Sequence, residues 1–355
     1  MDEESPLTQV DLPVNENYEK ETLGLTRASC ANQWFKKIFS REFAKTFFTG
    51  QFLSLMLCGT AVTSGLLQQY GVNAPTSQCF LNYVLLSIVY GGYLGCRSGE
   101  RTLSCIIKTQ GWKYALLAVI DVEANYLVVK AYSYTSVTSV QVLDSFSIPA
   151  VMLLSYIFLR VKYHISHIIG AIICLTGIGG LILADVLAKN HPDSSQASNI
   201  PVGDVLCIFG AILYSVSNVG EEYVVKNYAK SEFLGMIGIF GSFVSGIQAI
   251  ILERDRFEGV DFLSVKILLP WILYSICLFL MYSIMTIGIQ YTSAAAINLA
   301  ILSADFYALL AGIFVFNYTF HILYFFAMAF IVFGIIVYSI KDTENRVPNT
   351  PQQLH

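Results

Sequence analysis

Charged side chains set inside long apolar segments are the residues of this sequence best placed to do chemistry. The five most prominent are Asp121, Glu123, Lys130, Asp144 and Asp305. A charge at bilayer depth costs at least a few kcal/mol. We therefore expect each of these side chains to face a polar cavity or a partner on another helix.

The acids share helical faces with amides. Gln141, Asp144 and Ser145 follow one another at i, i+3 and i+4, while Asn298 and Asp305 are separated by two helical turns. We expect Asp144 and Asp305 to line one cavity and to couple a conformational change to a proton or to a cationic group. The alternative is that both acids only tie their helices to neighbouring helices.

Two further groups of charges are candidates for coupling or gating. Asp121 shares a face with Asn125, whereas Glu123 shares one with Lys130, so the last two could simply neutralise each other. Glu222 precedes Lys226 by one helical turn near a predicted helix end, a spacing typical of an exposed ion pair. The coupling or gating candidates are Asp121, Glu123, Lys130, Glu221 and Glu222.

Composition places the chain in a bilayer. Charged residues make up 13% and apolar residues 55%, against about 25% and 45–50% in soluble proteins, and the mean hydropathy is +0.59. The net charge of −4 gives no reason to expect a nucleic-acid partner. The cysteines are scattered without a Cys-x-x-Cys pair, and no phosphate-binding Gly-x-x-x-x-Gly-Lys loop occurs, so we expect no metal, cofactor or ATP-driven pump.

Ten segments have the roughly 20 mostly apolar residues that a membrane-spanning helix needs. They are residues 46–66, 76–95, 113–132, 137–159, 164–186, 203–221, 233–252, 267–289, 293–316 and 319–340. The predicted organisation is a disordered cytosolic tail (1–31), an interfacial amphipathic helix (32–45), a five-helix repeat (46–186), a polar linker (187–202), a second five-helix repeat (203–340) and a cytosolic tail (341–355). The fold class is thus all-α and multi-pass. For residues 32–45, the first turns of span 1 are the alternative interpretation.

The two halves carry related sequences. An ungapped offset of 157 residues, the separation of Tyr134 and Tyr291, also places Gly177-Ile178 on Gly334-Ile335. Most of the 21 Lys and Arg residues fall on one side of the predicted spans, which favours cytosolic termini at both ends. Because equivalent spans of the two copies, such as spans 4 and 9, are offset by five, an odd number, the repeats should be inverted, an arrangement that supports alternating access in secondary transporters.

Several short stretches are similar to those of a known family. The stretches are Asp121-Val122-Glu123-Ala124-Asn125-Tyr126, Thr138-Ser139-Val140-Gln141, Leu143-Asp144, Ser217-Asn218-Val219, Glu221-Glu222-Tyr223, Glu232-Phe233-Leu234-Gly235-Met236 and Ser245-Gly246-Ile247-Gln248. They resemble signature stretches of the F subfamily of solute carrier family 35, in the drug/metabolite transporter superfamily. The resemblance implies ten helices in two inverted five-helix halves around a central cavity lined by spans 1, 3, 4, 6, 8 and 9. By span and helical face, it carries over as solute-binding positions Asn125, Gln141, Asp144, Tyr214, Tyr282, Asn298 and Asp305.

The solute is expected to be neutral or cationic and flat. A bound diphosphate calls for Arg or Lys, whereas the predicted cavity holds acids, amides and tyrosines. The resemblance likewise implies a purine-like base or nucleoside of the queuine type. A nucleotide-sugar antiporter of the secretory pathway, with Lys130 as its cation, is the second interpretation, and a non-transporting membrane receptor or scaffold is the third.

The other expectations concern partners and subcellular location. The chain is expected to be a transporter rather than an enzyme, with a small-molecule solute, the lipid bilayer and protons as partners, and a homodimer remains open. It would lie in the plasma membrane or in Golgi and other endomembranes.

Overall fold

The computed structural model describes residues 41–70, 72, 74–97, 102–131, 134, 143–188, 200–254, 264–316, 322–341 and 344–345. By its internal contacts the chain divides into Met1–Ala44 and Lys45–His355. All side-chain contacts given below lie within the second unit. The predicted tail (1–31), the first part of the predicted interfacial helix (32–40) and Gln141 fall outside the described residues.

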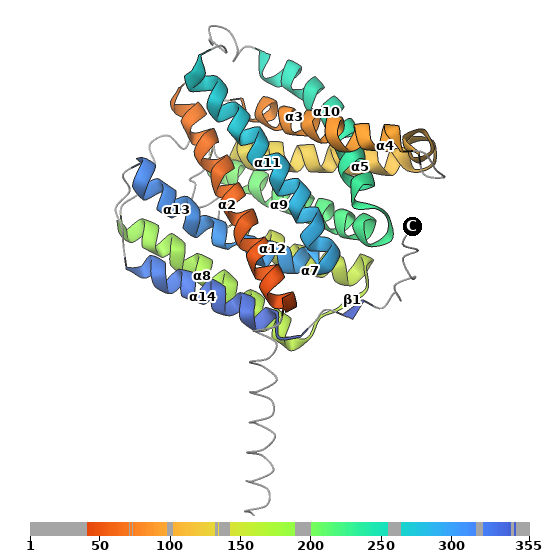
Figure 1. Ribbon diagram of the computed structural model, residues 1–355. Coiled ribbons are helices and arrows are strands. Elements are labelled where there is room, and N and C mark those ends of the chain that lie inside the picture. The colour runs from red at the N-terminus through yellow and green to blue at the C-terminus, as the bar shows by residue number, and fades with distance from the viewer. Residues whose placement is uncertain are drawn as a thin grey trace, which may run out of the picture. The chain divides into compact units, whose positions relative to one another are not determined.

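The described part of the chain is built almost wholly from helices (Figure 1). In chain order the elements are α2 (Arg41–Gln69), α3 (Pro75–Leu86), the π-helix η1 (Ser87–Gly91), α4 (Gly92–Cys96), α5 (Leu103–Ala131), α7 (Ser147–Phe158), β1 (Val161–Lys162), α8 (Ile165–Ala188), α9 (Ile200–Asn227), α10 (Lys230–Leu252), α11 (Val265–Tyr291), α12 (Ala294–Ile301), α13 (Ser303–Phe316), α14 (Leu323–Tyr338) and β2 (Glu344–Asn345). The all-α class is therefore confirmed.

Among the described residues, five helical stretches are long and apolar enough to cross a membrane. They are Ala44–Leu67, Thr76–Cys96, Pro201–Asn227, Lys230–Leu252 and Val265–Tyr291. Each of the other predicted segments overlaps a helix. α7, α12, α13 and α14 are shorter, α5 is rich in charged residues, and the apolar stretch found in α8 is Ile165–Gly180. Ten spans therefore stay a prediction.

Several helices extend beyond their predicted ends. α2 already includes Arg41, so the helix runs without a break through the predicted boundary at Lys45. α5 begins at Leu103 rather than at Lys113, and α9 ends at Asn227 rather than at Glu221. Loop polarity misleads at these positions because polar residues can continue a helix beyond its apolar stretch, where they meet water or, like Glu222, pack against another helix.

The segment predicted as one span from 293 to 316 is two helices. α12 ends at Ile301 and α13 starts at Ser303. Ser54 on α2 lies at this break: its hydroxyl is 3.3 Å from the carbonyl oxygens of Ala300 and Ile301 and 2.8 Å from the Ser303 hydroxyl. Helix ends leave carbonyl groups without intrahelical partners, so a neighbouring hydroxyl stabilises an interruption inside an apolar layer.

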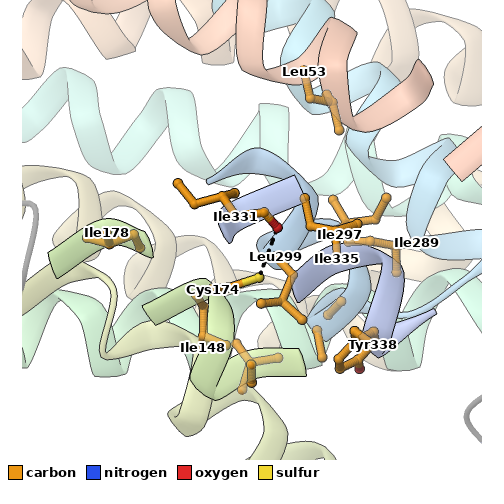
Figure 2. Packing of buried hydrophobic residues seen from close by; sticks show 14 of the residues in the cluster. Leu53, Ile148, Cys174, Ile178, Ile289, Ile297, Leu299, Ile331, Ile335 and Tyr338 are labelled. Atoms are coloured by element: carbon orange, nitrogen blue, oxygen red, sulfur yellow. Dashed lines mark hydrogen bonds between the residues drawn. The ribbon is translucent and has the colours of Figure 1, made fainter. Parts of the chain in front are cut away.

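The helices pack mainly as pairs from opposite halves of the sequence. α3 and η1 lie along α10, α5 lies along α9 and α10, and α8 lies along α14 (Figure 1). One apolar cluster joins α7, α8, α11, α12 and α14, and Figure 2 shows Cys174 of this cluster beside Ile331. A second cluster joins α3, α5, α9, α10 and α11. The contacts between α5 and α9 hold together the helices that carry most of the candidate site residues.

Glycines bring α8 and α14 into close contact. A Cβ atom added at Gly170 would lie 2.6 Å from the Tyr338 nitrogen and 2.8 Å from the Gly334 oxygen. One added at Gly177 would lie 2.7 Å from Cγ1 of Ile331. Small residues allow such backbone approach between membrane helices, where dispersion contacts rather than the hydrophobic effect drive association.

Replacing Gly170 by alanine is therefore expected to destabilise the protein by roughly 1–3 kcal/mol, because the new methyl group meets backbone atoms that cannot move aside. The matched control is Gly179→Ala on the same helix, where an added Cβ meets nothing within 4 Å. Thermal unfolding in detergent compares the two variants. Equal melting temperatures would show that the α8–α14 contact is not as close as described.

The connection between α7 and α8 is more than the tight helical hairpin that its length predicts. Val161 and Lys162 pair in antiparallel register with Asn345 and Glu344. The His167 ring adds a contact between its Nε2 and the carbonyl oxygen of Lys341, 2.8 Å apart. The start of the predicted C-terminal tail is thereby attached to this connection.

Candidate functional site

Asp121 is the centre of a polar cluster buried between four helices. On α5 its side chain is only 5% exposed. The Tyr83 hydroxyl from α3 and the Tyr282 hydroxyl from α11 each donate to Oδ2 over 2.7 Å. The Ser217 hydroxyl from α9 donates to Oδ1 over 2.9 Å. Three hydroxyl donors satisfy a carboxylate that would otherwise be costly at this depth.

Asn125 extends the cluster one turn along α5. Its amide nitrogen donates to the hydroxyls of Tyr83 (3.3 Å) and Tyr282 (3.4 Å), and its Oδ1 accepts from the Tyr214 hydroxyl at 2.8 Å. The rings of Tyr83 and Tyr282 meet edge to face, with centroids 6.2 Å apart. We call this set the Asp121 hub. It comprises Tyr83, Asp121, Asn125, Tyr214, Ser217 and Tyr282.

The hub combines residues that the sequence assigned to two different roles. Asn125, Tyr214 and Tyr282 were predicted to bind solute, and Asp121 was predicted to couple or gate. Tyr83 and Ser217 were missed. A tyrosine in an apolar run looks like ordinary packing, and only the pairing of α3 with α5 and α11 reveals its partner. Ser217 could have been found, because it lies in Ser217-Asn218-Val219, one of the stretches that resemble the family.

Glu221 and Glu222 form a second group of acids at the end of α9. Both are buried, with 6% and 0% exposed. The Thr286 hydroxyl on α11 donates to Glu221 over 2.7 Å. Glu222 pairs with Lys226 and also accepts from the backbone nitrogen of Ala294, the first residue of α12, over 3.0 Å. The predicted pair with Lys226 is present, but its predicted exposure is wrong because α9 continues past both glutamates and packs there against α11 and α12.

The predicted pair of Asp144 and Asp305 stays a prediction. Asp305 lies on α13, beyond the break at Leu302, and its side chain is outside the described atoms. Asp144 has a buried Oδ1 without a hydrogen-bond partner among the described residues. Asn298 on α12 accepts a hydrogen bond from Asn218 on α9 at 3.2 Å. This bond joins Asn298, a predicted solute-binding residue, to the helix that carries Glu221 and Glu222.

Glu123 and Lys130 contact different neighbours. The Gln248 amide nitrogen on α10 lies 3.4 Å from Oε1 of Glu123. The Lys130 ammonium lies 5.9 Å from the centre of the Tyr134 ring. Beside Glu123, a small cavity between α3, α5 and α10 reaches the hub at two of its residues; it is lined by Thr76, Cys79, Tyr83, Val122, Asn125, Tyr126, Ser245 and Gln248.

A sequence model of solute carrier family 35 matches residues 39–340 of this chain. Solute carrier family 35 member F2 of Mus musculus is 45% identical over 314 residues, which cover 88% of this chain and 83% of the relative. The chain belongs to the F subfamily of solute carrier family 35. The F2 member of Xenopus tropicalis is 44% identical over 311 residues, covering 87% of this chain and 79% of that one. The family resemblance found in the sequence motifs is thus confirmed.

More distant matches extend over the same region. An uncharacterized solute carrier family 35 member of Schizosaccharomyces pombe is 37% identical over 305 residues, covering 85% of this chain and 59% of the relative. A solved crystal structure of a protein superposes with a TM-score of 0.65 over 83% of this chain and 96% of that chain. At 15% identity this similarity shows the fold alone.

Membership of solute carrier family 35 makes this chain a multi-pass membrane transporter. The Asp121 hub joins the two halves of this carrier, since α3 and α5 belong to the first half of the chain, and α9 and α11 to the second.

Proposed function

We propose that this carrier moves a small, flat, neutral or cationic solute, a purine-like base or nucleoside, by alternating access. The observation that carries the proposal is the Asp121 hub. Its side chains offer a carboxylate, an amide and three phenols, which suit the ring edges and faces of a base. Binding there would replace hydrogen bonds that now join α3, α5, α9 and α11, so solute and helix movement would be linked.

Pseudosymmetry supports the alternating-access part of the proposal. Asn125 donates to Tyr282 and Cys174 to the Ile331 carbonyl, and the partners in both contacts are 157 residues apart, the offset of the sequence repeat. When equivalent residues of two repeats touch each other, they lie near the axis that relates the repeats. Two such contacts on different helix pairs are expected when two related halves pack against each other, as inverted repeats do.

The same cluster argues against the nucleotide-sugar alternative. A diphosphate needs Arg or Lys, whereas the side chains that bind Asp121 and Asn125 in the hub contribute hydroxyl groups. Lys226 pairs with Glu222, and Lys130 lies near Tyr134 toward the end of α5. Neither of these contacts involves a residue of the hub.

Uptake by purified protein in proteoliposomes tests the proposal. We expect bases or nucleosides such as guanosine to compete for uptake, and UDP-sugars to compete at least about tenfold less well, a difference of 1.4 kcal/mol. Lys130→Ala should reduce uptake less than Asp144→Asn does. Selective competition by a UDP-sugar, together with a larger loss in Lys130→Ala, would favour the nucleotide-sugar antiporter. Absence of any solute accumulation would favour a receptor or scaffold.

A further inference from the structure

Glu221 continues the hub toward the end of α9. It follows Ser217 by one helical turn, and its donor Thr286 follows Tyr282 by one turn on α11. The Thr286 hydroxyl also contacts the carbonyl oxygen of Tyr282 at 2.8 Å. The pair formed by Glu221 and Thr286 is thus stacked directly on the contacts of Ser217 and Tyr282 with Asp121.

The charges of this stack are not balanced. Asp121 is bound by Ser217, which precedes Glu221 by one helical turn on α9, and Glu222 is the next residue, so three acids lie along one short stretch of this helix pair. Within the part of the chain that the structure describes, Lys226 is the ion-pair partner of Glu222, and neither Asp121 nor Glu221 has a recorded ion pair. Two ionised carboxylates at this depth without a cation would cost several kcal/mol. One bound proton removes one of the charges without requiring new space.

The titratable groups around the two acids do not supply that missing charge. They are Cys79 and Tyr83 on α3, Tyr214, Glu222 and Lys226 on α9, Tyr282 on α11, and, toward Glu222, Tyr163 and Tyr338. Apart from Lys226, each of these groups is neutral when protonated and negatively charged when deprotonated, so none of them can act as a cation. Lys226 already faces Glu222, so within the described residues these contacts leave no cation for Asp121 and Glu221, and one can come from solution.

We propose that Asp121 and Glu221 together form the coupling site of this carrier and bind one proton that crosses the membrane in fixed ratio to the solute. This inference rests on the proposed transport function. The proton comes from water on one side, forms an O–H bond with one carboxylate, and returns to water on the other side. Protonation weakens the acceptor that holds hydroxyls of α3, α9 and α11, so the two halves can separate when the site is loaded.

The location differs from the one that the sequence favoured. Asp144 and Asp305 were predicted to be the coupling acids because they share a stripe with amides. Asp121 instead contacts α3 in the first half of the chain and α9 and α11 in the second, and Glu221 on α9 is bound by Thr286 of α11. A coupling group has to act on both halves, and these contacts provide the means.

The test uses full-length protein in proteoliposomes that contain a fluorescent pH indicator. Guanosine serves as the solute probe, with Asp121→Asn and Glu221→Gln as nearly isosteric variants. The matched control is Glu232→Gln, since Glu232 is also a buried glutamate, 2% exposed, that accepts from a tyrosine, Tyr114, at 2.7 Å. Asp144→Asn tests the rival site.

For wild type and Glu232→Gln we expect guanosine uptake to shift the internal pH, and net uptake to change about tenfold between about pH 5.5 and 8, as for a site that must gain one proton. In Asp121→Asn and Glu221→Gln both effects should be lost. In Glu221→Gln, which lies outside the hub, guanosine counterflow should persist to within about threefold because exchange needs no proton cycle, whereas Asp121→Asn also changes the proposed solute site.

Three outcomes would overturn the inference. The first is a wild-type protein that transports guanosine with no proton movement. The second is dependence on a Na⁺ gradient at constant pH. The third is loss of pH dependence in Asp144→Asn but not in Glu221→Gln. Failure of wild type to transport any base or nucleoside would instead refute the proposed function itself, so the two failures are distinguishable. A variant that shows no counterflow is checked by thermal unfolding, and Glu221→Asp, which restores the carboxylate, should then recover the pH response.

Discussion

Asn125→Leu is expected to lower guanosine uptake about 100-fold, which corresponds to about 2.7 kcal/mol of lost binding in the transition state for transport. Asn125 donates to Tyr83 and Tyr282 and accepts from Tyr214. Leucine has nearly the same size but no polar atom, so these phenols lose a partner and the amide is no longer available to the solute. A buried polar group left without a partner costs roughly 1–3 kcal/mol.

Initial uptake rates over a range of guanosine concentrations measure this effect, and the melting temperature of the purified variant shows how much of it is due to folding. Asn227→Leu is the matched control, because Asn227 is exposed at the end of α9 and its amide contacts only the Tyr223 carbonyl among the recorded bonds. We expect the control to transport within about twofold of wild type, as surface substitutions usually cost little. Equal activity of the two variants would exclude Asn125 from the transport site.

Glu222→Ala is the second substitution for which we expect a large effect. Removing one partner of a buried ion pair costs roughly 3–5 kcal/mol, and here the lower end applies because the Lys226 side chain is 19% exposed. The change also removes the acceptor for the Ala294 nitrogen at the start of α12. α9 and α12 would then lose the contact that joins them at this end of the bundle, so this end should open more readily.

Two measurements separate these consequences. Thermal unfolding reports the loss of stability, and labelling of a cysteine placed at Thr292, just before α12, reports opening. The double variant Glu222→Gln with Lys226→Gln should be more stable than Glu222→Ala, because it retains a side-chain acceptor for the Ala294 nitrogen and leaves no unpaired charge. If Glu222→Ala melts like wild type and labels no faster, Glu222 does not hold this end closed.

The contact between Glu222 and the start of α12 matters because α12 is a short helix that ends at the interruption before α13. Glu222 binds the start of α12, while Ser54 lies at its end. α12 is therefore held at both ends by helices from different halves of the chain. A short helix fixed in this way can tilt as a unit when either contact is released.

Sequence by itself determined which residues share one helix face. Asn125 follows Asp121 by one turn, and the two meet the same tyrosines because a helix places residues i and i+4 on one side. Apolar composition and length determined that the chain is helical and lies in a membrane, and short motifs determined its family. These properties depend on local spacing, which the sequence contains directly.

Only the tertiary structure decided which faces meet. Tyr83 lies on α3 and Ser217 on α9, and neither shows from its own neighbours that it binds Asp121. The sequence predicted that Glu222 belongs to an exposed ion pair, whereas in the structure it is buried against the start of α12. Contacts between helices far apart in the chain depend on how complete faces fit together, because burial and hydrogen bonding at each position are set by the partner helix.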